Sequence, residues 1–187
     1  DSTGRFELAI APSNVNKIYA AAEGTPNSNL YVSSDAGASW TLTTVSGTNT
    51  NWLSAQGWYD NTIVVHPTDE NKMYVGGVNL YTITMISPTQ RTIASISSGS
   101  VHVDHHNLMI IPRTGGGFRI LNSNDGGIGV SGDSSSGWTK PTDGLNTTQF
   151  YGVDKKPGAS AYIGGMQDNG TWRSPENATA ASRWVSQ

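Results

Sequence analysis

Cysteine is absent from the 187 residues, which excludes disulfides, thiolate metal sites and cysteine nucleophiles. Charge is also scarce, because charged residues make up 13% of the chain against about 25% in a typical globular protein. The net charge of -3 provides no basic field for phosphate backbones, so nucleic acid is not expected as a partner. No run approaches the roughly 18 apolar residues of a transmembrane helix, and we expect no membrane span.

Glycine, serine, threonine and asparagine are abundant instead, with 22 glycines alone, so hydroxyls and amides would keep the chain soluble. Its length corresponds to about one domain. The chain begins at Asp1 without a basic and apolar leader, so we expect a processed product or a segment of a larger protein. Helical periodicity is nearly absent, which favours strands.

One pattern occurs four times: a short apolar strand, a proline turn and a second strand. The four prolines are separated by 55, 45 and 45 residues, which is the length of a propeller blade. The first copy continues into a third strand, a tight turn and a fourth strand, so each copy predicts a four-stranded antiparallel blade. We therefore predict an all-β segment of a propeller spanning 1–187, which belongs to a larger ring or completes its ring with another copy. The prolines are Pro12, Pro67, Pro112 and Pro157, and the predicted blades span about 5–50, 59–97, 101–145 and 147–187.

The turn between the third and fourth strands of the first copy reads "SSDAGASW", and each conspicuous residue in it has a role in folding. Asp35, which follows Ser33 by two positions, can accept hydrogen bonds from turn amides. Gly37 can supply a positive φ where the chain reverses. Trp40 is expected to pack between neighbouring sheets. The stretch predicts a structural turn and no chemistry.

This turn resembles the Asp-box of the bacterial-neuraminidase-repeat (BNR) propellers, a superfamily that includes sialidases, xyloglucanase-like glycoside hydrolases and sortilin/Vps10 receptors. The resemblance implies that the box lies on the face opposite the binding site. A second, partial copy keeps Ser131, Asp133 and Trp138 but has Ser135 in place of the glycine.

The order of motifs from Gln56 to Trp172 resembles a group of large secreted bacterial proteins with sortilin-like or xyloglucanase-like propellers. That resemblance implies export, so we expect a secreted or cell-surface protein. The resemblance implies a particular enzymatic activity less firmly than it implies export. The six arginines lack the placement of a sialidase triad, and xyloglucanase-like enzymes place catalytic aspartates on two separate propellers.

In a propeller, the loop that leads into the first strand of each blade shares one face with the turn that follows the second strand. Acids, imidazoles and aromatic rings are concentrated at these places, so we expect them to converge. They are Trp52, Trp58, Tyr59 and Asp60 before the second copy, His102, Asp104 and His106 before the third, Asp125 after its second strand, and Gln167, Asp168, Asn169 and Trp172 in the fourth copy.

Several of these residues are candidate ligand contacts. Exposed aromatic faces hold sugar rings in many proteins, although Trp52, Trp58 and Tyr59 could equally pack in the core. Gln167, Asn169 and Trp172 are the candidates in the fourth copy. Two aspartates could instead form the carboxylate pair of a glycoside hydrolase, and the alternative is that they shape glycine-rich turns. The candidate catalytic aspartates are Asp60, Asp104, Asp125 and Asp168.

His102, Asp104 and His106 alternate, so in an extended segment their side chains would point the same way and could ligate Zn, Mn or Ca. The alternative is a hydrogen-bonded row that ties adjacent blades together. No cofactor is required, and a divalent metal ion is the only one that the sequence suggests.

Three functions follow as hypotheses. The first is an extracellular binding or scaffold module that recognises a glycan or a protein on the channel face. The second is a glycoside hydrolase, xyloglucanase-like or sialidase-like, that acts through paired aspartates. The third is a structural surface protein that self-assembles. The fold alone does not decide among them.

Overall fold

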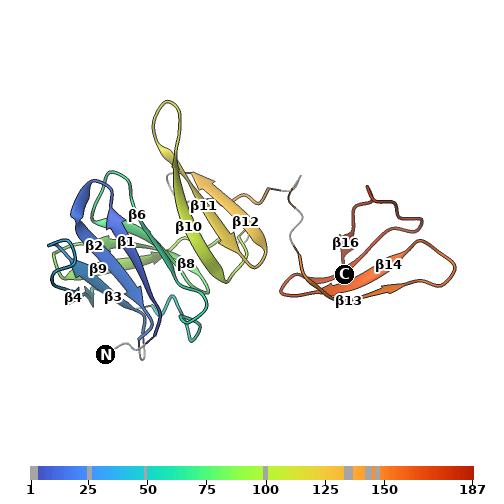
Figure 1. Cartoon of the computed structure of the whole chain (residues 1–187), viewed down its shortest axis with the longest axis horizontal. Coiled ribbons are helices and arrows are strands. Elements are labelled where there is room, and N and C mark those ends of the chain that lie inside the picture. The colour runs from blue at the N-terminus through green and yellow to red at the C-terminus, as the bar shows by residue number, and fades with distance from the viewer. Residues whose placement is uncertain are drawn as a thin grey trace. The chain divides into compact units, whose positions relative to one another are not determined.

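The computed structural model describes residues 4–24, 27–48, 50–98, 101–132, 137–141, 145 and 148–187. Within these ranges the chain forms strands, turns and irregular backbone, without a helix, and its strands make four sheets (Figure 1). The predicted all-β fold of four successive, mainly antiparallel blade-like sheets is confirmed. None of the described segments is a helix of the length and hydropathy that a membrane crossing needs.

The chain divides into two compact units, and each is described by itself. Unit 1 holds the first three sheets, and unit 2 holds the fourth. Unit 1 comprises Asp1–Asn124 and Ile128–Pro141, and unit 2 comprises Asp125–Gly127 and Thr142–Gln187.

Sheet one has its strands in sequence order, each antiparallel to the next. The Pro12 turn joins the first two strands, because proline presets φ for a turn and has no N–H to pair in a ladder. The strands are β1 (Phe6–Ala11), β2 (Asn14–Ala22), β3 (Asn29–Ser33) and β4 (Thr41–Leu42).

Sheet two has the same antiparallel order and one additional strand from the first repeat. After β4 the chain passes Thr43 and continues as β5 (Thr44–Val45), which pairs in parallel with the edge strand of sheet two. The fourth strand predicted for the first copy is therefore divided between two sheets. The remaining strands are β6 (Thr62–Val65), β7 (Lys72–Gly76), β8 (Leu80–Met85) and β9 (Gln90–Ser95).

Sheet three has three strands in the described residues instead of the predicted four. The place of the fourth is taken by an isolated bridge between Val130 and Thr139. Pro141 follows two positions later and has no N–H to extend this pairing. The strands are β10 (His105–Pro112), β11 (Phe118–Asn124) and β12 (Gly127–Gly132).

Sheet four, in unit 2, is an antiparallel sheet of four strands in sequence order. Most of its residues are exposed or partly buried, and the first strand is exposed throughout. The strands are β13 (Phe150–Lys155), β14 (Tyr162–Met166), β15 (Gly170–Arg173) and β16 (Val185–Ser186).

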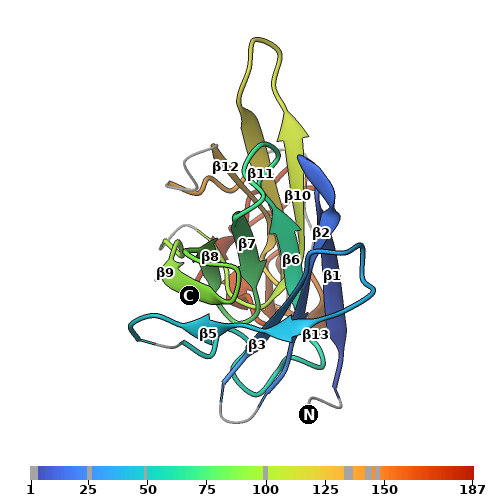
Figure 2. The same cartoon turned by 90° about the vertical axis from the view of Figure 1, so that its left-hand side faces the viewer.

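The first strands of the three sheets in unit 1 are neighbours, and β6 contacts β1 on one side and β10 on the other (Figure 2). Two apolar cores lie between successive sheets. One joins sheets one and two, and the other joins sheets two and three. Burial of each large apolar side chain in them stabilises the fold by about 1.5–3 kcal/mol. Since both of these cores are shared between sheets, each sheet of unit 1 depends on a neighbour.

The turn between β3 and β4 has the hydrogen bonds that the sequence predicts. Asp35 Oδ1 accepts from Ser39 N at 2.9 Å, and Asp35 Oδ2 accepts from Ser39 Oγ at 2.6 Å. Ser33 Oγ donates to Asp35 Oδ1 at 2.7 Å, and Gly37 has φ +92°. These hydrogen bonds, that from the Ser39 hydroxyl first, lower the pKa of Asp35 to about 2.

Trp40 and Trp138, which end the two similar turn sequences, differ in their surroundings. Trp40 does not pack between sheets as expected, because it is exposed and its Nε1 donates to the Gly37 carbonyl within the same turn. Trp138 is buried in the core between sheets two and three, and its Nε1 donates to the Ile96 carbonyl at 2.9 Å. Ser131 is buried too, whereas Asp133 lies outside the described residues.

Candidate functional site

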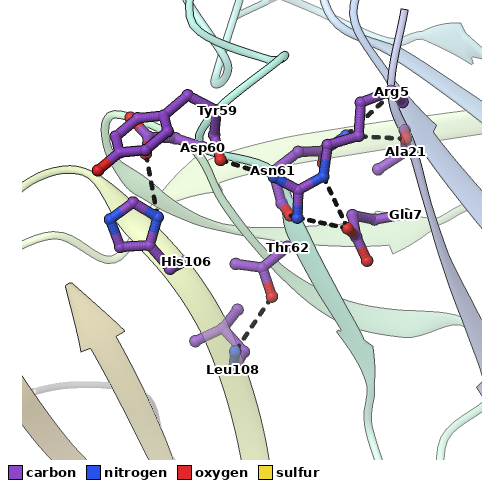
Figure 3. A network of polar contacts seen from close by, with 9 residues as sticks. All are labelled: Arg5, Glu7, Ala21, Tyr59, Asp60, Asn61, Thr62, His106 and Leu108. Carbon is purple, nitrogen blue, oxygen red and sulfur yellow. Dashed lines mark hydrogen bonds and ion pairs between the residues drawn. The ribbon is translucent and has the colours of Figure 1, made fainter.

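In unit 1, the chain segments that lead into the first strands converge, as predicted. Residues before β1, residues before β6 and the start of β10 form one polar network (Figure 3). The end of β7 joins it, because Asp104 N and His105 N donate to the carbonyls of Val78 and Gly77. This region is the candidate site.

Trp58 and Tyr59 lie in the turn before β6 and are exposed, at 67% and 41%. The amide of Tyr59 donates to the Gln56 carbonyl, which fixes the turn. The two ring centroids are 5.5 Å apart, and the Tyr59 ring meets the imidazole of His106 edge-on at 4.8 Å. We call Trp58, Tyr59 and His106 the aromatic platform.

Asp60 contacts the aromatic platform through His106. Its side chain is fully buried, and its Oδ1 lies 3.4 Å from His106 Nδ1, whereas the His106 side chain is 31% exposed (Figure 3). A buried carboxylate beside one ring nitrogen fixes the orientation of an imidazole. Asp60 is thus placed to hold His106, and burial keeps its carboxylate from touching a substrate.

Arg5 and Asn61, which the sequence analysis missed, join the leading loops. Arg5 Nη1 donates to the Tyr59 carbonyl at 2.6 Å, and its Nε donates to Glu7 Oε1 at 2.9 Å. Asn61 is fully buried, and its Nδ2 donates to the Ala21 carbonyl at 3.1 Å. Neither residue belongs to a motif, so only the three-dimensional structure reveals their role.

Trp52 is part of the core, which corrects its assignment as a ligand contact. It is 1% exposed, and its loop lies so close to Gly77 that a Cβ there would overlap the Trp52 carbonyl oxygen. The Arg91 guanidinium carbon lies 5.5 Å from the centroid of the Trp52 ring. A ring held in this way presents no face to a ligand.

The metal hypothesis loses its geometric basis. His102 and Asp104 precede β10 in irregular backbone, and Asp104 has φ +61°, so the side chains do not alternate as in a strand. A shift in strand register also falls between His105 and Asn107, beside His106. In the part of the chain that the structure describes, no three His, Asp or Glu side chains are grouped to hold a metal ion.

Three candidates of the fourth copy, Gln167, Asp168 and Asn169, lie in the tight turn between β14 and β15, and Trp172 lies on β15. Asp168 is exposed and has φ +56°, as a turn residue does, while Asn169 Nδ2 donates to the Gln167 carbonyl and the Asn169 carbonyl accepts from Trp172 Nε1 at 2.6 Å. These residues belong to unit 2, to which Asp125, in the turn between β11 and β12, is also assigned.

Comparison with known proteins gives solved structures only. No family model matches the chain, and no curated protein does. The GH74 xyloglucanase from Xanthomonas campestris is similar with 14% identity and a TM-score of 0.39, over 97% of this chain and 34% of that one. The GH74 enzyme of Niastella koreensis has 17% identity and a TM-score of 0.39, over 100% and 32%. The chain thus spans about a third of the length of either enzyme.

Proposed function

We propose that the chain is an extracellular binding module that recognises a carbohydrate on the aromatic platform. The observation that carries this proposal is the pair of exposed rings, Trp58 and Tyr59, next to an imidazole held by a buried carboxylate. Large aromatic side chains exposed in a single turn are available for contact, unlike Trp52 in the core.

The chemistry of the platform suits a sugar. The apolar faces of aromatic rings pack against the C–H groups of a pyranose, and the imidazole offers a hydrogen-bonding nitrogen for a hydroxyl. Trp58 and Tyr59 are exposed, so we expect contact with the rings to provide most of the affinity. We expect a Kd between about 1 mM and 1 μM, which corresponds to about -4 to -8 kcal/mol.

The test is a screen of the 187-residue chain against plant and bacterial cell-surface oligosaccharides, followed by titration calorimetry with each that binds. We expect Trp58→Ala to raise Kd at least about tenfold through loss of the stacked ring, which corresponds to about 1.4 kcal/mol. Tyr151→Ala is the matched control, since Tyr151 is 72% exposed but lies on β13, and it should leave Kd unchanged. Failure to bind any oligosaccharide, or binding that Trp58→Ala does not weaken, would contradict the proposal.

The glycoside hydrolase hypothesis can be tested with the same oligosaccharides by measuring the release of reducing ends. It requires two accessible carboxylates, and the burial of Asp60 leaves Asp104, Asp125 and Asp168 as its candidates. Repeating the titrations in EDTA tests the divalent metal ion. A binding module predicts affinity without turnover and no effect of the chelator.

A further inference from the structure

Sheet one exposes one apolar face. Along β1, Phe6, Leu8 and Ile10 are 47%, 62% and 56% exposed, whereas Ala9 and Ala11, on the opposite face, are buried. Leu42 on β4 and Trp40 beside it are exposed as well. We call Phe6, Leu8, Ile10, Trp40 and Leu42 the back face. A contiguous apolar surface that carries no charge is typical of an interaction site.

The junction between sheets one and two shows how such faces are covered in this fold. Sheet one contributes small residues, Ala9 and Ala21, and sheet two contributes the branched residues Ile63 and Val65 of β6. The small side chains on β1 and β2 therefore share a core with the large side chains of the next sheet's first strand, and Tyr19, Leu30 and Val32 of sheet one complete that core. The back face likewise carries large side chains of a first strand. In the described residues, however, no sheet with small side chains packs against it.

Sheet four has a glycine at the matching repeat position, on a face that also carries Asp154, Ile163 and Arg173. Asp154 pairs with Ile163 as Ala9 pairs with Tyr19, so Gly165 stands where Ala21 stands in sheet one. A hollow of about 300 Å³ opens on this sheet, lined by Gly152, Val153, Asp154, Ile163, Gly164 and Gly165. A Cβ at Gly152 or Gly165 would meet nothing within 4 Å, so the hollow has room for large side chains.

We propose that the back face binds sheet four of a second copy of this chain, head to tail. The large side chains of β1 would enter the glycine-lined hollow, as those of β6 meet the alanines of sheet one. Two copies together hold eight sheets, which lies within the about four to eight blades of known propellers. Both surfaces belong to this chain, so the pairing needs no other protein.

The experiment is sedimentation velocity of the whole 187-residue chain over a range of concentrations. We expect a species of twice the 19.8 kDa of one chain. Leu8→Asp should give the monomer, because it replaces an apolar contact with a carboxylate and places it near Asp154 of the hollow, and circular dichroism should show that the variant is folded. Ile86→Asp is the control, since Ile86 is 52% exposed in the turn after β8, and it should leave the dimer intact.

A reciprocal variant tests the other surface. Gly165→Leu fills the hollow without a clash within its own chain and should also give the monomer. In a mixture of the two variants, sheet four of the Leu8→Asp copy and the back face of the Gly165→Leu copy are both unaltered, so one junction should re-form and give a dimer. A wild-type chain that is monomeric at every concentration would overturn the proposal, and so would a dimer that resists both substitutions.

Discussion

His106 Nδ1 lies 3.4 Å from Asp60 Oδ1, and the two side chains differ sharply in exposure, at 31% and 0%. The pair joins two sheets, since Asp60 precedes β6 and His106 belongs to β10. Because this contact links the loop before β6 to β10, we expect it to affect both the stability of unit 1 and the position of the aromatic platform.

The first prediction concerns this contact. His106→Ala removes a polar contact from a buried carboxylate, so we expect the free energy of unfolding to fall by about 1–3 kcal/mol. His102→Ala is the matched control, because His102 lies four positions earlier in the loop before β10, and it should cost within about 0.5 kcal/mol. Urea unfolding followed by tryptophan fluorescence measures both. Equal losses in the two variants would show that the contact with Asp60 contributes nothing.

The second prediction is a pH dependence set by Asp35. Hydrogen bonds from Ser39 and Ser33 lower its pKa from 3.8 to about 2, so the folded state favours the ionised carboxylate. This contribution is complete above pH 3.8 and is lost as the pH falls through about 2.

The comparison with Asp35→Asn isolates that effect. The asparagine keeps an oxygen acceptor but cannot ionise, so wild type should be the more stable protein near neutral pH and should lose this advantage between pH 4 and pH 2. Urea midpoints at a series of pH values measure the difference. A constant difference over that range would show that the Asp35 carboxylate is not what stabilises the turn.

The sequence predicted the parts of the fold that depend on local pattern. The proline turns and the Val, Ile and Tyr strands give the four sheets, and the spacing of Ser33, Asp35 and Gly37 gives the turn, because each is a matter of backbone geometry within a few residues. The convergence of the leading loops in unit 1 followed from the repeat.

Burial could not be predicted in the same way. Trp40 and Trp138 stand seven positions after Ser33 and Ser131, yet Trp40 is exposed and Trp138 is buried, because in the described residues only Trp138 has another sheet packed against its own side. Trp52 and Trp58 share one loop and also differ in burial, because Trp52 belongs to the core between sheets one and two and Trp58 does not. The alternation of side chains predicted for His102, Asp104 and His106 is not found, because Asp104 adopts a positive φ, which the sequence pattern does not reveal.

The third prediction uses this difference in burial. Trp138→Ala leaves a cavity between sheets two and three and an unmatched Ile96 carbonyl, so we expect a loss of about 3–5 kcal/mol. Trp58→Ala removes a ring of the same size that is 67% exposed, and its cost should stay below about 1 kcal/mol. Thermal and urea unfolding of both variants measure the contrast. A Trp138→Ala protein as stable as Trp58→Ala would contradict the core that joins sheets two and three.

The last prediction concerns Arg91, a buried cation at the junction of sheets one and two. Its Nη1 donates to the Thr43 carbonyl at 3.3 Å and to the Thr43 hydroxyl, and its Nη2 donates to the Ser28 carbonyl at 3.3 Å. Burial lowers the pKa of Arg91 to about 10, and no carboxylate forms an ion pair with it in the described residues. Two opposing effects therefore decide its contribution: the cost of a desolvated charge and the gain from satisfying buried carbonyls.

Arg91→Met separates these effects, because methionine fills much of the space without charge or donors. The carbonyls of Ser28 and Thr43 would lose their donor, so we expect a loss of about 1–3 kcal/mol in the free energy of unfolding. Hydrogen exchange gives a local readout, since the amides of Thr44 and Ser46 bond to the carbonyls of Thr89 and Arg91 and should exchange faster if β5 loosens from sheet two. A variant more stable than wild type, with unchanged exchange at these amides, would show that the desolvation of the guanidinium outweighs its hydrogen bonds.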